Sequence, residues 1–387
     1  MPPVEAWAKV FITGEGGEEF LNDTEVHMRL GCIGCHGGNE GRNTKDVAHE
    51  GFDVDPSEGE NNKCADLCHQ PELGHYYTDS VHATQVGYKT LFTERSGTTI
   101  DGHPEFEEGF EADCSACHAS CGDCHISQPN NVGGGLVNGH MINRTPDQIR
   151  NCTACHGSRV GDEYTGANDY AGFDAHYIPG RMQCVDCHTA QEMHGTPGAA
   201  PQTRYEEPNM PRCEDCHSDD LDANSYHTSH LAGNTTSLQC QVCHSQTYKS
   251  CNACHVGEGI TGSSYPSFEI GRNPIPDLRS EYEYVLLRHI PIAEDTFRGW
   301  GLEDLENYED VETWKYTSPH NIRRLGTAVD PDGDGTPSCD GCHSDSPEQD
   351  LFLRASDLED LSADEQAANQ DVIVPSGTPF SLGRTDR

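Results

Sequence analysis

Regular patterns of hydrophobic and polar residues are short and few along this chain. Alternating apolar positions predict strands over 7–13, 282–292 and 371–375. Helical spacing predicts helices over 18–29 and 362–370. The pattern therefore predicts a mostly irregular, coil-rich chain with short helices and few strands.

The composition explains why these patterns are weak. Hydrophobic residues make up 34% of the 387 residues, below the usual globular range, while 40 Gly and 22 Pro favour loops. A chain this poor in apolar side chains cannot bury a large core of its own. A bound non-protein group is therefore expected to fill the interior, and the pattern of cysteines indicates its identity.

All 20 cysteines of the chain fall into ten copies of one motif. Nine copies read Cys-x-x-Cys-His, and the tenth has three intervening residues. Three residues make nearly one helical turn, so both sulfurs and the imidazole face one side of a short helix. This spacing is the attachment signature of c-type haem, in which the histidine becomes the proximal iron ligand. The copies are Cys32-Cys35-His36, the variant Cys64-Cys68-His69, Cys114-Cys117-His118, Cys121-Cys124-His125, Cys152-Cys155-His156, Cys184-Cys187-His188, Cys213-Cys216-His217, Cys240-Cys243-His244, Cys251-Cys254-His255 and Cys339-Cys342-His343.

Zinc ribbons and redox-active dithiols also use Cys-x-x-Cys pairs. Neither needs a histidine directly after the second cysteine, yet all ten pairs have one in a chain with only 22 His. The set therefore favours ten covalently bound haem c groups, whose porphyrin faces would form a stacked core with little protein core. The variant at Cys64 requires a bulged loop to keep the sulfur spacing.

The remaining histidines nearly match the number of distal ligands that ten haems require. Ten His are proximal and twelve remain, so about ten of the twelve are predicted to bind iron. Two imidazoles leave no open coordination position, which favours electron transfer over substrate binding. His75 and His103 are the least constrained, and His227 and His230 share a helical face that suits two different haems or one bystander. The candidates are His27, His49, His75, His82, His103, His140, His176, His194, His227, His230, His289 and His320.

The spacing of the motifs divides the chain into four predicted regions. The aromatic-rich third region has no motif and is predicted to supply His289 and His320 as distal ligands from a distance. The acidic tail is predicted either to be solvated or to pair with a neighbouring chain. The regions are 1–130 with four haem sites, 131–255 with five, 256–338 with none, and 339–387 with the tenth site and the tail.

The formal net charge is −41, from 65 acidic and 24 basic residues. The negative electrostatic potential of such a chain argues against nucleic acid and anionic lipid as partners and suits a basic redox partner. No run of 18 apolar residues exists, so no membrane span is predicted.

An acidic turn precedes the last motif. Asp330, Asp332, Asp334 and Gly335 match the start of a calcium-binding loop, but Gly341 stands where that loop needs a Glu. Bound Ca2+ and a simple acidic turn are both compatible with this pattern.

The motif ladder over 32–343, the supply of distal histidines and the thin core resemble the multihaem c-type cytochromes. The chain is similar to extracellular cytochromes that carry respiratory electrons to minerals, electrodes or partner cells, some of which polymerise into filaments. The resemblance implies an electron carrier rather than an enzyme, with other cytochromes or mineral and electrode-like acceptors as partners, and self-association. It also implies that His27, His289 or His320 act across a subunit interface.

A second resemblance, to multihaem reductases of nitrite, hydroxylamine or tetrathionate, implies one open or Lys-ligated haem. The lack of any Cys-x-x-Cys-Lys motif counts against the nitrite type. Haem attachment to these motifs is extracytoplasmic, so an extracellular or cell-surface location is expected. No signal peptide stands at Met1, and the printed sequence is therefore expected to be the mature form.

Overall fold

The computed structural model describes residues 27, 30–57, 62–69, 77–114, 119–129, 132–167, 172–221, 224–231, 237–247, 254–257, 260–262, 268–290, 292–343 and 350–376. The strand predicted over 7–13 and all but His27 of the helix predicted over 18–29 lie outside these residues.

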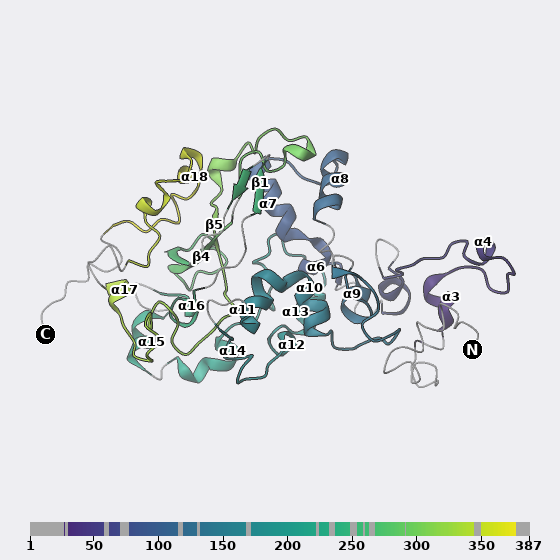
Figure 1. Ribbon diagram of the computed structural model, residues 1–387, viewed down its shortest axis with the longest axis horizontal. Helices are drawn as coiled ribbons and strands as arrows, with labels where there is room; N and C mark the ends of the chain where they lie inside the picture. Colours follow the sequence, from purple (N-terminus) through teal and green to yellow (C-terminus); the bar gives the residue numbers. More distant parts are fainter. Residues whose placement is uncertain are drawn as a thin grey trace, which may run out of the picture. The chain divides into compact units, whose positions relative to one another are not determined.

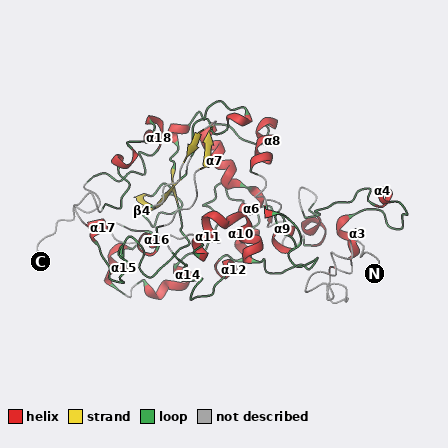
Figure 2. Cartoon of the chain, viewed as in Figure 1, coloured by secondary structure: helices red, strands yellow, loops and turns green. Residues whose placement is uncertain are grey.

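Short helices, small antiparallel sheets and much loop make up the described chain (Figures 1 and 2). The prediction of an irregular chain with short helices and few strands is confirmed at this level. The chain forms two compact units whose sequences interleave. The first unit consists of Met1–Gly87, Glu111–His156 and Cys184–Met210, and the second of Tyr88–Phe110, Gly157–Gln183 and Pro211–Arg387.

The helical segments of the first unit are short, and most of them contain or adjoin a haem motif. Turns of this length are marginal on their own and need contacts outside the helix to persist. They are α3 (Gly31–His36), α4 (Lys45–Ala48), η2 (Cys64–Cys68), α6 (Val81–Thr84), α9 (Cys121–His125), η6 (Gln148–Cys152), α10 (Thr153–His156), α12 (Cys184–Cys187) and α13 (Ala190–His194).

Polar contacts, rather than apolar side chains, fill the described interior of the first unit. Of the hydrophobic residues buried in the described chain, Ala65 alone belongs to this unit. The buried Asn151 side chain donates to the carbonyl oxygens of Asp123 and Ser127, at 2.5 and 2.7 Å. A unit of this size normally rests on a hydrophobic core, so its described side chains alone give it little stability.

The second unit contains the one apolar core of the described residues, built on a three-stranded antiparallel sheet. Strands β3 (Glu269–Arg272), β4 (Tyr284–His289) and β5 (Trp314–Tyr316) lie in the order β3-β4-β5. The central strand β4 confirms the strand predicted over 282–292, within narrower bounds.

Strand β4 buries side chains on both faces, because successive residues of a strand point to opposite sides. Tyr284 and Leu286 belong to one cluster, with Ile270 and Phe352. Val285 and Leu287 belong to a second cluster on the other face, which includes the nearly inaccessible Trp314, Leu353 and Val372. This double burial explains why residues 284–287 form a continuous apolar run.

Residues 350–376 complete this core, so the prediction of a solvated tail is wrong for them. Helix α18 (Ala363–Ala368) confirms the helix predicted over 362–370, and the Ser362 hydroxyl caps its first turn. The strand predicted over 371–375 is wrong. Val372 and Val374 are buried and bond the backbones of Arg272 and Leu353, but they form no strand.

Helices of the second unit carry the remaining described motifs and flank the core. Helix α7 (Val86–Ser96) and helix α8 (Pro104–Asp113) lie mostly in this unit. They contribute Phe92 and Phe106 to an aromatic cluster with Trp300 and Phe297. The other helices are η7 (Gly157–Gly161), α11 (Asp162–Thr165), α14 (Glu214–His217), η8 (Ser218–Asp220), α15 (Ser225–His230), α16 (Cys240–His244), η9 (Arg298–Trp300), η10 (Tyr308–Asp310), α17 (Asp340–His343) and η12 (Ala355–Leu358). Strands β1 (Cys254–Gly257) and β2 (Ile260–Gly262) form a separate antiparallel pair.

Candidate haem sites

Most described motifs form a single helical turn, as the spacing predicts. The turns are α3, α9, α10, α12, α14, α16 and α17. In several of them the histidine N–H donates to the carbonyl of the first cysteine, at 2.8 Å from His188 to Cys184 and 2.9 Å from His217 to Cys213. This bond closes the turn and brings both sulfurs and the imidazole to one side. Cys254 and His255 instead lie in β1.

The variant motif reaches the same closure through a wider turn. Residues Cys64–Cys68 form the π-helical turn η2, and the His69 N–H donates to the Cys64 carbonyl at 2.9 Å. The bond spans five residues instead of four, so the extra residue is absorbed as a bulge inside the turn.

Of the motif histidines whose side chains the structure describes, seven face a second histidine from outside the motifs. The distances between ring centroids fall between 5.9 and 6.2 Å. Each pair joins one predicted proximal ligand to one predicted distal ligand within a single unit. The pairs are His69 with His27, His36 with His140, His156 with His82, His125 with His194, His217 with His176, His244 with His227, and His343 with His230.

This separation fits one metal ion held between two imidazoles. An imidazole nitrogen binds a first-row metal at about 2.0–2.1 Å, which places the two nitrogens about 4 Å apart and the ring centroids roughly 6 Å apart. Ordinary aromatic contacts range over about 4.5–7 Å and have no reason to join motif to non-motif histidines. The narrow range and the consistent pairing therefore favour ligation over ring packing.

The ring nitrogen Nδ1 of many of these histidines donates a hydrogen bond to a backbone carbonyl. His36 donates to the Asp53 carbonyl and His125 to the Asn143 carbonyl, both at 2.7 Å. His230 donates to the Tyr226 carbonyl at 2.7 Å and His244 to that of Arg323 at 3.1 Å. A carbonyl only accepts, so Nδ1 carries the proton and Nε2 is left to bind a metal, as ligand histidines usually do.

Burial keeps several of these imidazoles neutral, the form that binds iron. Desolvation, with the neighbouring imidazoles of His156 and His188, lowers the pKa of His82 to about 4. Desolvation and His125 also lower the pKa of His194.

The sequence analysis did not predict the carboxylates that accept hydrogen bonds from three of the predicted ligand imidazoles. Asp174 accepts from His176, Glu192 from His188 and Asp220 from His217. The available signal was an acidic residue two to four positions from a histidine, which is too common in this acidic chain to be specific.

The structure gives other information on the remaining predicted ligands. His75 and His118 lie outside the described residues, and the side chain of His255 is not described. His49 is exposed and donates from Nδ1 to the Lys45 carbonyl at 2.8 Å. His103 stacks on Phe106, and the backbone N–H of His320 donates to Glu163.

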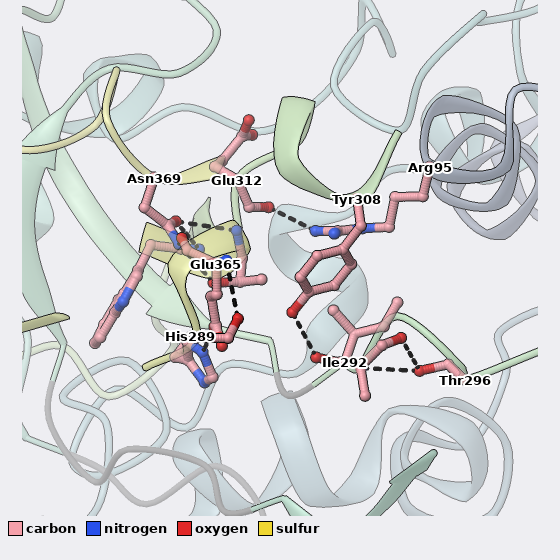
Figure 3. Close-up of polar contacts among 12 residues, drawn as sticks. Arg95, His289, Ile292, Thr296, Tyr308, Glu312, Glu365 and Asn369 are labelled. Atoms are coloured by element: carbon pink, nitrogen blue, oxygen red, sulfur yellow. Dashed lines mark hydrogen bonds and ion pairs between the residues drawn. The ribbon is translucent and has the colours of Figure 1, made fainter. Parts of the chain in front are cut away.

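His289 is placed differently from the distal ligand that the sequence predicts. It is buried at the end of β4, and its Nε2 donates to Glu365 Oε1 at 2.7 Å (Figure 3). Glu365 also accepts from the Thr313 hydroxyl at 2.7 Å, and Asn369 receives the N–H groups of Thr313 and Trp314. Through this hydrogen bond His289 joins β4 to α18, and its assignment as a distal ligand stays a prediction.

Successive motifs are linked within each unit. The links in the first unit follow the order 32–36, 64–69, 121–125, 152–156 and 184–188. They are Lys63 Nζ to the Cys35 carbonyl (2.8 Å), Asn62 Nδ2 to Cys121 Sγ (3.2 Å), Asn151 Nδ2 to the Asp123 carbonyl (2.5 Å) and the Cys184 N–H to Gln148 Oε1 (3.1 Å). In the second unit the Cys213 and Cys240 thiols hydrogen-bond each other, and Cys243 and Cys342 pack against one cluster.

Apolar side chains inside or beside the motif turns are exposed in the protein chain. Ile33 lies within the first motif and is 43% exposed, and Leu67 lies within the variant motif and is 69% exposed. Ile149, just before the motif at 152–156, is also exposed. Together with the described cysteines, none of which forms a disulfide, these side chains fit a porphyrin attached to each turn.

The acidic turn does not gather its carboxylates. Asp330 accepts the N–H groups of Asp334 and Gly335, and Asp334 accepts that of Thr336. Among the described residues, no group of three or more His, Cys, Asp or Glu is arranged to hold a metal ion, and calcium remains a sequence prediction. A haem iron needs only two protein ligands and is not tested by that criterion.

No helix in the described part of the chain is both long and apolar enough to span a membrane. The chain matches no protein-family model, and comparisons with curated proteins and solved structures give no match. The case for function therefore rests on the residues themselves.

Proposed function

We propose that the chain is a multihaem c-type cytochrome that binds haem at its ten motifs and carries electrons between redox partners outside the cytoplasm. The seven histidine pairs support this proposal most directly. Each offers an iron two axial nitrogens, at 5.9–6.2 Å between ring centroids, beside a pair of cysteines on one turn. Ring packing alone would not select these partners.

The residues divide the work of holding each group. The two cysteines of a turn would hold the haem covalently, and the motif histidine would bind its iron. The second histidine would also bind the iron and so exclude a substrate from it. Bound in this way, haem would supply reversible one-electron chemistry of its iron without an open coordination site.

The weak apolar core of the first unit supports a core made of cofactors. Ala65 is the single buried hydrophobic residue among its described positions, while Ile33 and Leu67 are exposed within their motifs. Stacked porphyrin faces would cover such side chains and supply the missing apolar contact.

The partners follow from charge and from the resemblance to extracellular cytochromes. A net charge of −41 favours encounter with basic redox proteins and opposes binding to nucleic acid. The resemblance supports mineral or electrode-like acceptors and self-association into filaments. Electron microscopy of the native protein tests self-association: long regular fibres support it, and discrete particles contradict it.

Haem content and spin state test the function itself. We expect the protein purified after haem maturation to contain ten covalent haems per chain by pyridine haemochrome assay, from the ten motifs. We expect low-spin spectra in both oxidation states, because both axial positions are occupied.

Two results would count against this proposal in different ways. A protein without covalent haem would overturn haem binding altogether. A haem-loaded protein with one persistent high-spin haem that binds nitrite or hydroxylamine would favour a reductase over an electron carrier.

A further inference from the structure

Three ligand histidines donate from Nδ1 to a carboxylate rather than to a carbonyl. His176 donates to Asp174 Oδ1 at 2.9 Å, and His217 donates to Asp220 Oδ2 at 2.9 Å. His188 donates to Glu192, with Oε1 and Oε2 at 2.9 and 3.0 Å. The corresponding acceptors of His36, His125, His227, His230 and His244 are backbone carbonyls.

Burial separates these three carboxylates into two kinds. The side chains of Asp174 and Glu192 are 2% and 5% exposed, whereas that of Asp220 is 64% exposed. Solvent and salt screen an exposed charge, but a buried charge acts on its neighbour through a low dielectric. Asp174 and Glu192 therefore have far more influence on their imidazoles than Asp220 has.

Local structure holds the carboxylate of Asp174 and the backbone of Glu192. Asp174 also accepts the backbone N–H of His176 at 2.7 Å and that of Ile322 at 2.6 Å. Glu192 lies in α13, whose first turn is capped by Thr189, one residue after His188. The Asp174 carboxylate cannot turn away from its imidazole without breaking two backbone hydrogen bonds, and the cap fixes the backbone from which Glu192 reaches His188.

A carboxylate that accepts from Nδ1 draws the ring proton toward itself and raises the basicity of Nε2. A more basic axial nitrogen donates more electron density and stabilises the ferric over the ferrous iron. The reduction potential of that site falls as a result. A neutral carbonyl acceptor has a weaker effect in the same direction.

We propose that Asp174 and Glu192 are positioning residues that set two low-potential sites in the chain. The first is the site of Cys213-Cys216-His217 with His176 as its second ligand, and the second is the site of Cys184-Cys187-His188. Both sites have a lower reduction potential than the described sites whose imidazoles donate only to backbone carbonyls. This inference rests on the proposed haem binding and assigns a role that haem binding alone does not require.

Each compact unit contains one such site, since His188 belongs to the first unit and His217 to the second. Electrons passing along either series of motifs then meet one step that is uphill relative to its neighbours. That step determines how strong a donor must be to reduce all the haems of the unit.

The test is a redox titration of the haem-loaded protein, followed by visible absorption and electron paramagnetic resonance. Glu192→Gln is the cleaner variant, because Gln keeps an acceptor oxygen for His188 while losing the charge. Asp174→Asn tests the site of His217 and His176, although the Asn amide would have to donate where the Asp174 carboxylate accepts the N–H of Ile322. Glu207→Gln is the matched control, since Glu207 is as buried as Glu192 but accepts from Asn209 instead of an imidazole.

We expect Glu192→Gln to move one of the ten haems to a more positive potential. The shift should be at least tenfold in the reduction equilibrium constant, which is 59 mV for one electron. Asp174→Asn should move a different haem in the same direction, and Asp220→Asn should have a much smaller effect.

The inference would be overturned if Glu192→Gln, at full haem content, titrated with the same lowest reduction potentials as the wild type. A shift no larger than that of Glu207→Gln, or loss of haem from Glu192→Gln, would also overturn it, because each would leave Glu192 a general electrostatic or structural role. Absence of haem from the wild-type protein would instead overturn the proposed function. Haem content, measured first on every sample, separates these outcomes.

Discussion

At the scale of single residues, the buried pair of His289 and Glu365 links strand β4 to helix α18. Burial alone would raise the pKa of the Glu365 carboxyl, but the hydrogen bonds from His289 and Thr313 outweigh it and lower that pKa. A carboxyl whose pKa is depressed by folding stabilises the folded state when ionised. This contribution is full above the unfolded pKa near 4.3 and is lost as the pH falls through the lower folded value.

We therefore expect Glu365→Gln to lower the local free energy of unfolding at pH 7 by about 1–3 kcal/mol, the cost of a lost charged hydrogen bond. Hydrogen exchange of β4 and α18 amides measures this loss. The difference between wild type and variant should vanish below the folded-state pKa of the carboxyl. Glu359→Gln, at an exposed position, is the control and should change little. Equal protection in wild type and Glu365→Gln at pH 7 would contradict the assignment.

At the scale of elements, α15 places two histidines on a single short helix for two different motifs. His227 lies 6.1 Å from His244 and His230 lies 6.0 Å from His343, both between ring centroids. The spacing of three puts both imidazoles on one face, and their Nδ1 atoms donate to the carbonyls of Asp220 and Tyr226. One helix thus orders two neighbouring sites.

We expect His227→Ala and His230→Ala each to convert one low-spin haem to a high-spin haem, and the double variant to convert two. The high-spin ferric signal in electron paramagnetic resonance and carbon monoxide binding by the reduced protein measure the number. His103→Ala is the matched control, because His103 stacks on Phe106 and should leave all haems low-spin. A single high-spin haem in the double variant would mean that one histidine is a bystander.

Contacts between residues close in sequence could be predicted from the sequence, and contacts between distant residues could not. The motif turns are local, so spacing alone placed Cys184, Cys187 and His188 together. Strand β4 was likewise predictable, because an apolar segment rich in β-formers is a local property of the sequence. The hydrogen-bond partner of His289 is Glu365, which lies 76 residues away in sequence. No pattern in the sequence around His289 predicts this partner. The apolar pattern over 371–375 predicts a strand. Tertiary packing instead buries this segment beside β3 without the regular backbone hydrogen bonds of a strand.

At the scale of the whole molecule, the two units differ in what holds them together. Among the described residues, the buried hydrophobic side chains belong almost wholly to the second unit, with Ala65 the exception. The sheet β3-β4-β5 and residues 350–376 form a core of the chain's own apolar side chains. The first unit has short turns and polar contacts, which do not offset the conformational entropy of ordering its chain.

We therefore expect the chain produced without haem maturation to lose structure unevenly. Peptides from 30–57 and 119–156 should exchange their amide hydrogens at nearly unfolded rates, whereas peptides from 268–290 and 350–376 should keep measurable protection. Hydrogen exchange with mass spectrometry on haem-free and haem-loaded chains makes this comparison, and the loaded chain controls for intrinsic mobility. Equal protection of both units in the haem-free chain would mean that the first unit has a protein core of its own, and that haem is not what holds it together.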